Sequence, residues 1–154
     1  MLEMTVKPTQ RGFTLIEMMV TVTIIAVMLG IGVPSFRNFI AGQKVKSASH
    51  DLMTAMVIAR SEAIKRNAAV TLSPVTADAW VSGWTVSAAP SATTVHQQQA
   101  LSGVTVSLAP STVVFQANGR TTATSRFQIT GTTTSKCVRI DLTGIPSSYS
   151  GACL

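Results

Sequence analysis

Three kinds of side chain in this sequence could do chemistry: one acid inside an apolar run, a pair of cysteines and a few arginines. Glu17 is the one charged residue between positions 13 and 33. A buried carboxylate costs about 2.5 to 3.5 kcal/mol at the centre of a bilayer, and less near its interface. An opposite charge is therefore expected to pair with Glu17, unless its side chain reaches the headgroups.

Cys137 and Cys153 are the only cysteines of the chain. Behind an export signal, such a pair predicts a disulfide in an oxidising compartment. The bond would close a loop of about 15 residues, contribute about 3 kcal/mol and hold the Ser- and Gly-rich residues 145–151 in place. A free reactive thiol is the alternative. A metal site is not expected, because His50 and His96 are far from both cysteines in sequence.

The basic excess of the chain points only weakly to a ligand. Twelve Lys and Arg against six Asp and Glu give a net charge of +6, and the basic residues are scattered, which is typical of a solvated surface. Arg120, Arg126 and Arg139 could nevertheless form a patch that contacts DNA phosphates. No Gly-any-Ser-any-Gly motif occurs, and neither histidine lies near a paired acid in sequence. The sequence predicts no enzyme activity, no cofactor and no metal.

The apolar run at residues 13–33 is long enough to cross a bilayer, because a core of about 30 Å takes roughly 20 helical residues. Residues 1–12 are polar, and Lys7 and Arg11 favour the cytoplasmic side. We therefore expect a leader at residues 1–12 and a transmembrane helix at residues 13–34. Cleavage after Gly12 keeps this helix as an anchor, whereas cleavage after Gly32 would release a soluble secreted domain.

An amphipathic segment, residues 35–67, follows the apolar run. Pro34 lacks the N–H that would bond to the carbonyl of Gly30, so a kink is expected there without an end to the helix. Apolar residues then recur at steps of three and four, which predicts a helix up to about Arg66 or Asn67 that packs on the chain's own sheet. The apolar stripe comprises Phe36, Phe39, Ile40, Val45, Ala48, Leu52, Ala55, Met56, Ala59 and Ala63.

The remaining residues, 68–154, form a predicted β-domain. Short runs rich in Val and Thr alternate with Gly, Pro, Asn and Ser, which is typical of antiparallel sheet. Asn118-Gly119 is the clearest turn, because both residues can adopt positive φ. The polar, patternless residues 88–102 predict a surface loop. Strands are expected at residues 69–73, 80–87, 104–108, 112–116, 126–130 and 137–142.

The junction between the leader and the apolar run carries a specific motif. Residues 11–17 (RGFTLIE) resemble the prepilin signal of type IV pilins and type II secretion pseudopilins. The resemblance implies that prepilin peptidase cleaves after Gly12 and methylates the new N-terminal amine of Phe13. It also implies that Glu17 pairs with the Phe13 amine of a neighbouring subunit in the filament core, where charge pairing offsets desolvation.

Later segments resemble the FimT/GspH-type minor pilins and pseudopilins, notably residues 59–66 (ARSEAIKR), 80–84 (WVSGW) and 115–120 (FQANGR), with the two cysteines. The resemblance implies an α+β, pilin-like fold, in which a long N-terminal helix packs on two small antiparallel sheets. Some members bind DNA through a Gly-Arg-any-Arg motif before the last cysteine. Residues 144–147 (GIPS) contain no arginine there, which disfavours DNA uptake.

The function implied by the resemblance is that of a non-catalytic structural subunit of a type IV pilus or a type II secretion pseudopilus, which acts in filament initiation or tip assembly and in protein secretion. Its expected partners are prepilin peptidase, other minor and major pilins or pseudopilins, the inner-membrane assembly platform, and membrane lipid before extraction. The expected location is the bacterial inner membrane, with one span, a cytoplasmic N-terminus and a periplasmic globular domain. Two alternatives stay open: a DNA-binding minor pilin for natural transformation, and the soluble domain released after Gly32.

Overall fold

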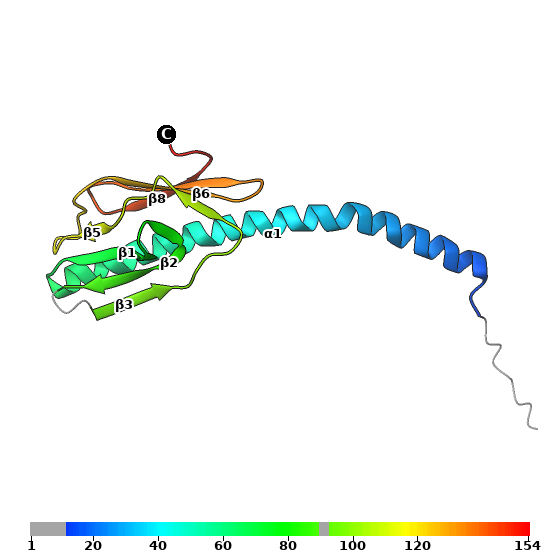
Figure 1. Ribbon diagram of the computed structural model, residues 1–154, viewed down its shortest axis with the longest axis horizontal. Helices are drawn as coiled ribbons and strands as arrows, with labels where there is room; N and C mark the ends of the chain where they lie inside the picture. Colours follow the sequence, from blue (N-terminus) through cyan, green and yellow to red (C-terminus); the bar gives the residue numbers. More distant parts are fainter. Residues whose placement is uncertain (1–11, 90–92) are drawn as a thin grey trace, which may run out of the picture. The chain divides into compact units, whose positions relative to one another are not determined.

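The computed structural model describes residues 12–89 and 93–154. Within these residues the chain forms one long helix, α1 (Leu15–Arg66), and eight β-strands (Figure 1). The chain divides into two compact units, Met1–Arg37 and Asn38–Leu154. Residues 1–11 of the predicted leader lie outside the described residues.

The first unit is helical from Leu15 onward, and α1 continues through Pro34. The expectation that the helix does not end at this proline is therefore confirmed. Every residue from 12 to 37 is exposed, including the large apolar side chains. The described residues of this unit bury no side chain, so their apolar surface needs cover from outside the unit.

The second unit buries the apolar face of α1 from Val45 onward, as the spacing of its apolar residues predicts. The buried positions are Val45, Ala48, Ser49, Leu52, Ala55, Met56, Ala59 and Ala63. The prediction is wrong for Phe36, Phe39 and Ile40, whose exposed fractions are 63%, 60% and 41%. Phe36 belongs to the first unit, and the β-domain first meets α1 near Gly42, which lies against Thr134.

The end of α1 is defined by a C-terminal capping motif. Asn67 adopts a left-handed conformation with φ of 48°. The N–H of Asn67 donates to the carbonyl of Ile64, and the N–H of Ala68 donates to that of Ala63, both at 3.2 Å. These two bonds form a Schellman motif, in which asparagine is the usual substitute for glycine. The predicted end at Arg66 or Asn67 is confirmed.

The strands form two antiparallel four-stranded sheets, with the orders β3-β2-β1-β5 and β4-β6-β7-β8. One helix packed on two small antiparallel sheets is the α+β, pilin-like architecture expected from the sequence. The strand bounds are β1 (Val70–Thr76), β2 (Ala79–Ala88), β3 (Thr93–Gln98), β4 (Thr105–Ser107), β5 (Val113–Phe115), β6 (Ser125–Thr130), β7 (Ser135–Ile140) and β8 (Pro146–Ser150).

Two edge strands lie where the sequence did not predict any. The predicted surface loop at residues 88–102 contains β3, which pairs with β2 from Trp84 opposite Gln98 to Ala88 opposite Thr93. Residues 146–150, expected to depend on the disulfide, form β8 and pair with β7. Both strands are mostly polar, because an edge strand takes its hydrogen bonds from one neighbour and leaves most side chains in solvent.

The predicted turn at Asn118-Gly119 is present, but its geometry differs from the expected one. Only Gly119 of the pair has positive φ, at 74°. The N–H of Gly119 donates to the carbonyl of Gln116, and the N–H of Gln116 donates to that of Arg120, both at 2.8 Å. This pattern is a three-residue loop with a glycine bulge, in which the asparagine keeps ordinary φ.

The two sheets meet around a buried tryptophan. Trp80 on β2 packs edge to face on Phe127 of β6, with ring centroids 4.8 Å apart and an interplanar angle of 81°. The indole Nε1 of Trp80 donates to the carbonyl of Pro110 at 2.7 Å, which satisfies its buried polar atom. Trp80 therefore joins the first sheet to the second in one core.

Candidate functional site

Glu17 lies in a capping box at the start of α1. The N–H of Glu17 donates to Oγ1 of Thr14 at 3.3 Å, and the N–H of Thr14 donates to Oε2 of Glu17 at 3.5 Å. This reciprocal pair satisfies backbone donors at the helix N-terminus, where the helix dipole also favours a negative charge. The Thr-x-x-Glu spacing at residues 14–17 carries the signal for this box, which the sequence prediction did not use.

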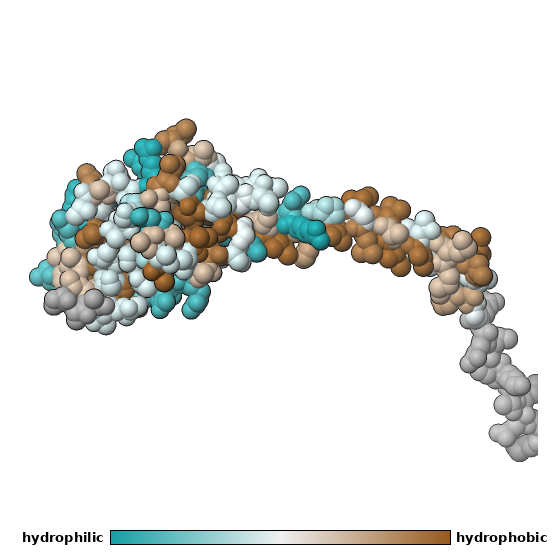
Figure 2. All heavy atoms as spheres, viewed as in Figure 1, coloured by the Kyte–Doolittle hydropathy of each residue, from teal (hydrophilic) through white to brown (hydrophobic). Residues whose placement is uncertain are grey.

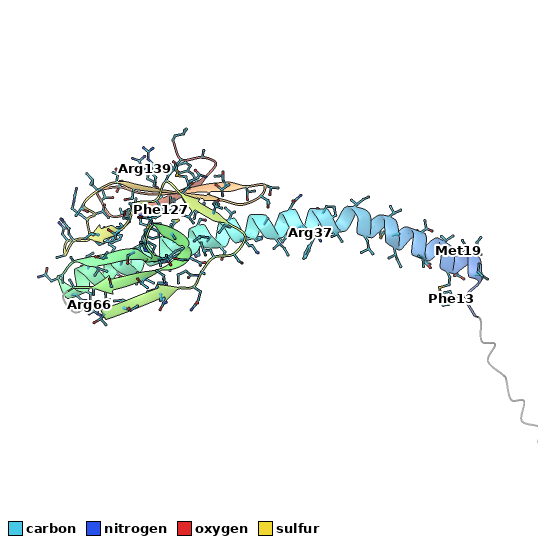
Figure 3. The ribbon with its side chains drawn as sticks, in the orientation of Figure 1. Phe13, Met19, Arg37, Arg66, Phe127 and Arg139 are labelled. Atoms are coloured by element: carbon cyan, nitrogen blue, oxygen red, sulfur yellow. A yellow bond between two sulfur atoms is a disulfide. The ribbon has the colours of Figure 1, made fainter. Side chains whose placement is uncertain are left out.

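The Gly12–Phe13 peptide bond lies just before the helix. Gly12, Phe13 and Thr14 have no regular secondary structure, and all three residues are exposed. The side chain of Phe13 is 72% exposed and is labelled in Figure 3. Proteases act most readily on exposed backbone outside regular structure, so this bond is accessible in the single chain.

An apolar surface extends along the described part of the first unit, residues 13–33. Figure 2 shows it as hydrophobic along the N-terminal part of α1. Among the described residues, α1 is the one helix long and apolar enough to cross a membrane, by length and composition, and the apolar window that meets this test is 0% buried. Exposed apolar side chains of this unit include Leu15, Ile16, Met19, Ile25, Met28 and Ile31.

The C-terminal tail is tied to the second sheet by a disulfide and by one amide side chain. Cys137 and Cys153 are bonded, with their Cα atoms 5.1 Å apart, so the predicted disulfide is confirmed. Gln128, opposite Cys137 in the β6–β7 register, donates through Nε2 to the carbonyl of Gly151 at 3.2 Å and accepts from the N–H of Cys153 at 2.6 Å. No sequence pattern indicates Gln128, because its role depends on the strand register.

Two of the three arginines proposed as a DNA-contacting patch are cross-strand neighbours in the second sheet. Arg126 and Arg139 lie directly opposite each other on β6 and β7, and both are exposed. Arg139 is labelled in Figure 3. Like charges opposite each other on a sheet are destabilising, so this pair is a favourable place for an anion. Arg120 is on the 116–120 hairpin, which packs against the turn at Gly144. A Cβ added at Gly144 would lie 3.5 Å from the Cα of Arg120.

Two half-buried carboxylates of the second unit are held in the ionised form by local donors. The Arg66 side chain, whose Nε lies 2.5 Å from Oε1 of Glu62, lowers the pKa of Glu62. The hydroxyl and the backbone N–H of Thr143 both donate to Asp141 and lower its pKa. Within residues 12–89 and 93–154, no group of three or more His, Cys, Asp or Glu could hold a metal ion.

Two family models match the sequence: the type II transport protein GspH over residues 48–144, and the prokaryotic N-terminal methylation motif over residues 7–33. Prepilin peptidase-dependent protein D of Escherichia coli (strain K12) is 44% identical over 48 residues, which are 31% of this chain and 30% of that protein. The type IV major fimbrial protein FimA of Dichelobacter nodosus is 46% identical over 39 residues, 25% of each chain. The chain thus matches less than a third of the length of these curated relatives.

The fold is also found among solved structures. The type IV minor pilin FimU of Pseudomonas aeruginosa (strain PAO1) matches with a TM-score of 0.61 and 20% identity, over 71% of this chain and 90% of that one. A second crystal form of FimU gives a TM-score of 0.60 and 21% identity, over 68% and 91% of the two chains. At this identity the likeness establishes the fold.

Proposed function

Because the chain belongs to the GspH family of type IV pilin-like proteins, we propose that it is a structural, non-catalytic subunit of a type IV pilus or a type II secretion pseudopilus. The exposed apolar surface of the first unit carries this proposal, since every residue from 12 to 37 is exposed and Glu17 is the one charged residue among residues 13–33. Lipid or neighbouring helices must cover such a surface. The subunit acts in filament initiation or at the tip, and thereby in protein secretion.

Processing occurs at the Gly12–Phe13 bond. Prepilin peptidase removes residues 1–12 as a leader and methylates the amine of Phe13. The exposed, non-helical backbone at residues 12–14 and the match to the N-terminal methylation motif support this site. The mature chain therefore begins one residue before the threonine that caps α1.

The mature subunit waits in the bacterial inner membrane until the assembly platform extracts it. Residues 13–34 span the lipid and later join the filament core, with a bend at Pro34. Residues 35–67 continue into the globular domain, and residues 68–154 form the β-domain, which lies in the periplasm. The cations of the leader favour a cytoplasmic N-terminus. Other minor and major pilins or pseudopilins replace lipid as the cover of the apolar helix.

Glu17 changes partner on assembly. In the single chain its carboxylate caps α1 through Thr14. Cleavage creates a cationic amine at Phe13, and in the filament the carboxylate of Glu17 pairs with this amine on a neighbouring subunit. The pair reduces the cost of burying both charges among apolar helices, a cost that would otherwise oppose assembly.

Substitution at Glu17 separates capping from charge pairing. Glu17→Gln keeps hydrogen-bonding atoms near Thr14 but loses the charge, whereas Thr14→Ala loses the cap and keeps the charge. In a strain that lacks the native copy, we expect Glu17→Gln to be processed normally and to be absent from sheared filaments. Thr14→Ala is expected to enter filaments.

Two controls keep this experiment interpretable. The Cys137–Cys153 disulfide should form in both variants, because Glu17 is exposed and the buried core of the described residues begins at Val45. Equal incorporation of Glu17→Gln and wild type would refute the charge pairing. Loss of incorporation in Thr14→Ala alone would assign Glu17 to helix capping instead.

Binding of DNA is the second candidate function, and the opposed pair of Arg126 and Arg139 favours it. A gel shift of the full chain in nonionic detergent, over a series of salt concentrations, tests it. Binding through this pair should weaken as salt rises and should be reduced in Arg126→Gln/Arg139→Gln. No retention of DNA at low salt would exclude this function.

A further inference from the structure

A pocket with a basic lining lies between α1 and the β7–β8 edge of the second unit. Its volume is 370 Å³, and its lining residues are Lys46, Ser49, His50, Met53, Lys136 and Ser148. A second hollow of 310 Å³ shares Lys46 and Lys136 with it. One lysine from the helix and one from the sheet therefore border both hollows.

Lys136 occupies a position where the sheet otherwise buries apolar side chains. Side chains two residues apart on a strand share one face, and Val138 and Ile140, the next positions on this face of β7, are both 0% exposed. Lys136 is half-buried at the end of this series. Its side chain therefore leaves β7 on the same face as Val138 and Ile140, and Lys136 lines the pocket together with Lys46.

No acid among residues 12–89 and 93–154 lies in the lining of this pocket beside its cations. Among the described residues, the ion pairs join Lys65 and Arg66 to Glu62, and no Asp or Glu lines either hollow. The chain has only six acids against twelve Lys and Arg. Because Lys46 and Lys136 line the same hollows, their positive charges add there, so an anionic ligand would be stabilised.

Ser148, a residue of the pocket lining, carries a buried hydroxyl without a partner. Oγ of Ser148 is buried and has no hydrogen-bond partner among the described residues. A buried hydroxyl without a partner costs about 1 to 3 kcal/mol, which a ligand acceptor would remove. By contrast, the hydroxyl of Ser49 donates to the carbonyl of Lys46 at 2.8 Å and is already satisfied.

We propose that this pocket receives the carboxylate of an Asp or Glu side chain from a neighbouring subunit of the filament. The inference rests on the proposed function, since it needs the subunit to be packed among others. A carboxylate accepts several hydrogen bonds and is matched by the ammonium groups of Lys46 and Lys136 and the hydroxyl of Ser148. Complementary charges across an interface fix the register of the partner. A subunit with a net charge of +6 also needs acids from its neighbours to offset the repulsion between like charges.

Carbodiimide cross-linking of isolated filaments tests the pocket, because the reagent joins an amine to a carboxylate only where the two are in contact. The full chain is produced in a strain without the native copy, and the linked peptides are mapped by mass spectrometry. The test variant is Lys46→Gln/Lys136→Gln. The matched control is Lys44→Gln, which removes a lysine two residues away that lines a different hollow.

We expect wild type and Lys44→Gln to give cross-links from Lys46 or Lys136 to an acid of another subunit. The double variant should lose them, and its incorporation should fall about fivefold, the effect of a partly exposed ion pair. Disulfide formation in the membrane fraction confirms that the double variant folds. The pocket is supported if incorporation falls in the double variant but not in Lys44→Gln, and if wild type shows the cross-links.

Other outcomes separate the failure of the pocket from the failure of the proposed function. The pocket is overturned, and the filament role stays intact, if the double variant enters filaments as well as wild type does and if neither lysine is cross-linked in wild type or in Lys44→Gln. Absence of even the wild-type chain from filaments overturns both. Protection of Lys46 and Lys136 from acetylation by inorganic phosphate, without cross-links in filaments, assigns the pocket to phosphate and overturns the carboxylate partner.

Discussion

Removal of the disulfide tests how the C-terminal tail is held. The double variant Cys137→Ala/Cys153→Ala deletes a cross-link between residues 16 apart. For a loop of this length, the chain-entropy relation gives about 10 cal/mol/K, or about 3 kcal/mol at 25 °C. Because Cys137 is 0% exposed, the small cavity left by its sulfur adds to the loss.

Two other interactions remain in that variant and should keep the tail folded. Residues of β8 stay paired with β7, and the Gln128 amide still contacts Gly151 and residue 153. We therefore expect the free energy of unfolding to fall by about 3 kcal/mol without loss of the fold. The additional change Gln128→Ala should remove about 1 kcal/mol more, because it leaves partly buried backbone groups of residues 151 and 153 without these partners.

Urea unfolding of the full chain in nonionic detergent measures these changes through the fluorescence of Trp80 and Trp84, which are buried at 2% and 1% exposure. Wild type treated with a reducing agent is the matched control and should lose slightly less stability than the double variant, because it keeps both sulfur atoms. A loss below about 1 kcal/mol, or a reduced wild type as stable as the oxidised one, would refute the reasoning.

Two further perturbations test the strand geometry and the loop electrostatics. A Cβ added at Gly83, where φ is +92°, would lie 2.2 Å from the carbonyl oxygen of Gln98 on β3, so Gly83→Ala should lower the free energy of unfolding by at least about 2 kcal/mol. Gly151→Ala, at φ of +105° with open space, should cost less in the same urea experiment, and equal costs would contradict the clash. Because donors on Thr143 lower the pKa of Asp141, its ionised form stabilises the folded chain at neutral pH, and this contribution is lost as pH falls through the lowered pKa. NMR titration should show a higher pKa for Asp141 in Thr143→Val, and an unchanged pKa would exclude this cause.

Periodicity predicted the parts of this fold whose side chains face the core. The apolar residues of α1 from Val45 to Ala63 and the six Val- and Thr-rich strands follow regular patterns, because burial selects apolar residues at the period of the element. The same reasoning failed at Phe39 and Ile40. Periodicity identifies an apolar face but not the length over which another element covers it, and the β-domain meets α1 only beyond these residues.

The missed features depend on register or on backbone pairing. β3 and β8 are polar edge strands, held by the main chain of β2 and β7, so their sequences carry little pattern. Gln128 acts on the tail because β6 places it opposite Cys137. Lys46 and Lys136 are far apart in sequence, and only the packing of β7 along α1 brings them to one pocket.

The mature N-terminus is the most direct test of the filament role. The chain should be purified from the membrane and from filaments of a producing strain, and its intact mass should be measured with sequencing of the N-terminal peptide. Cleavage after Gly12 predicts a chain of residues 13–154 with one added methyl group on the amine of Phe13. A mature chain that begins at Val33 would contradict the filament role, because it would lack both Glu17 and the apolar helix.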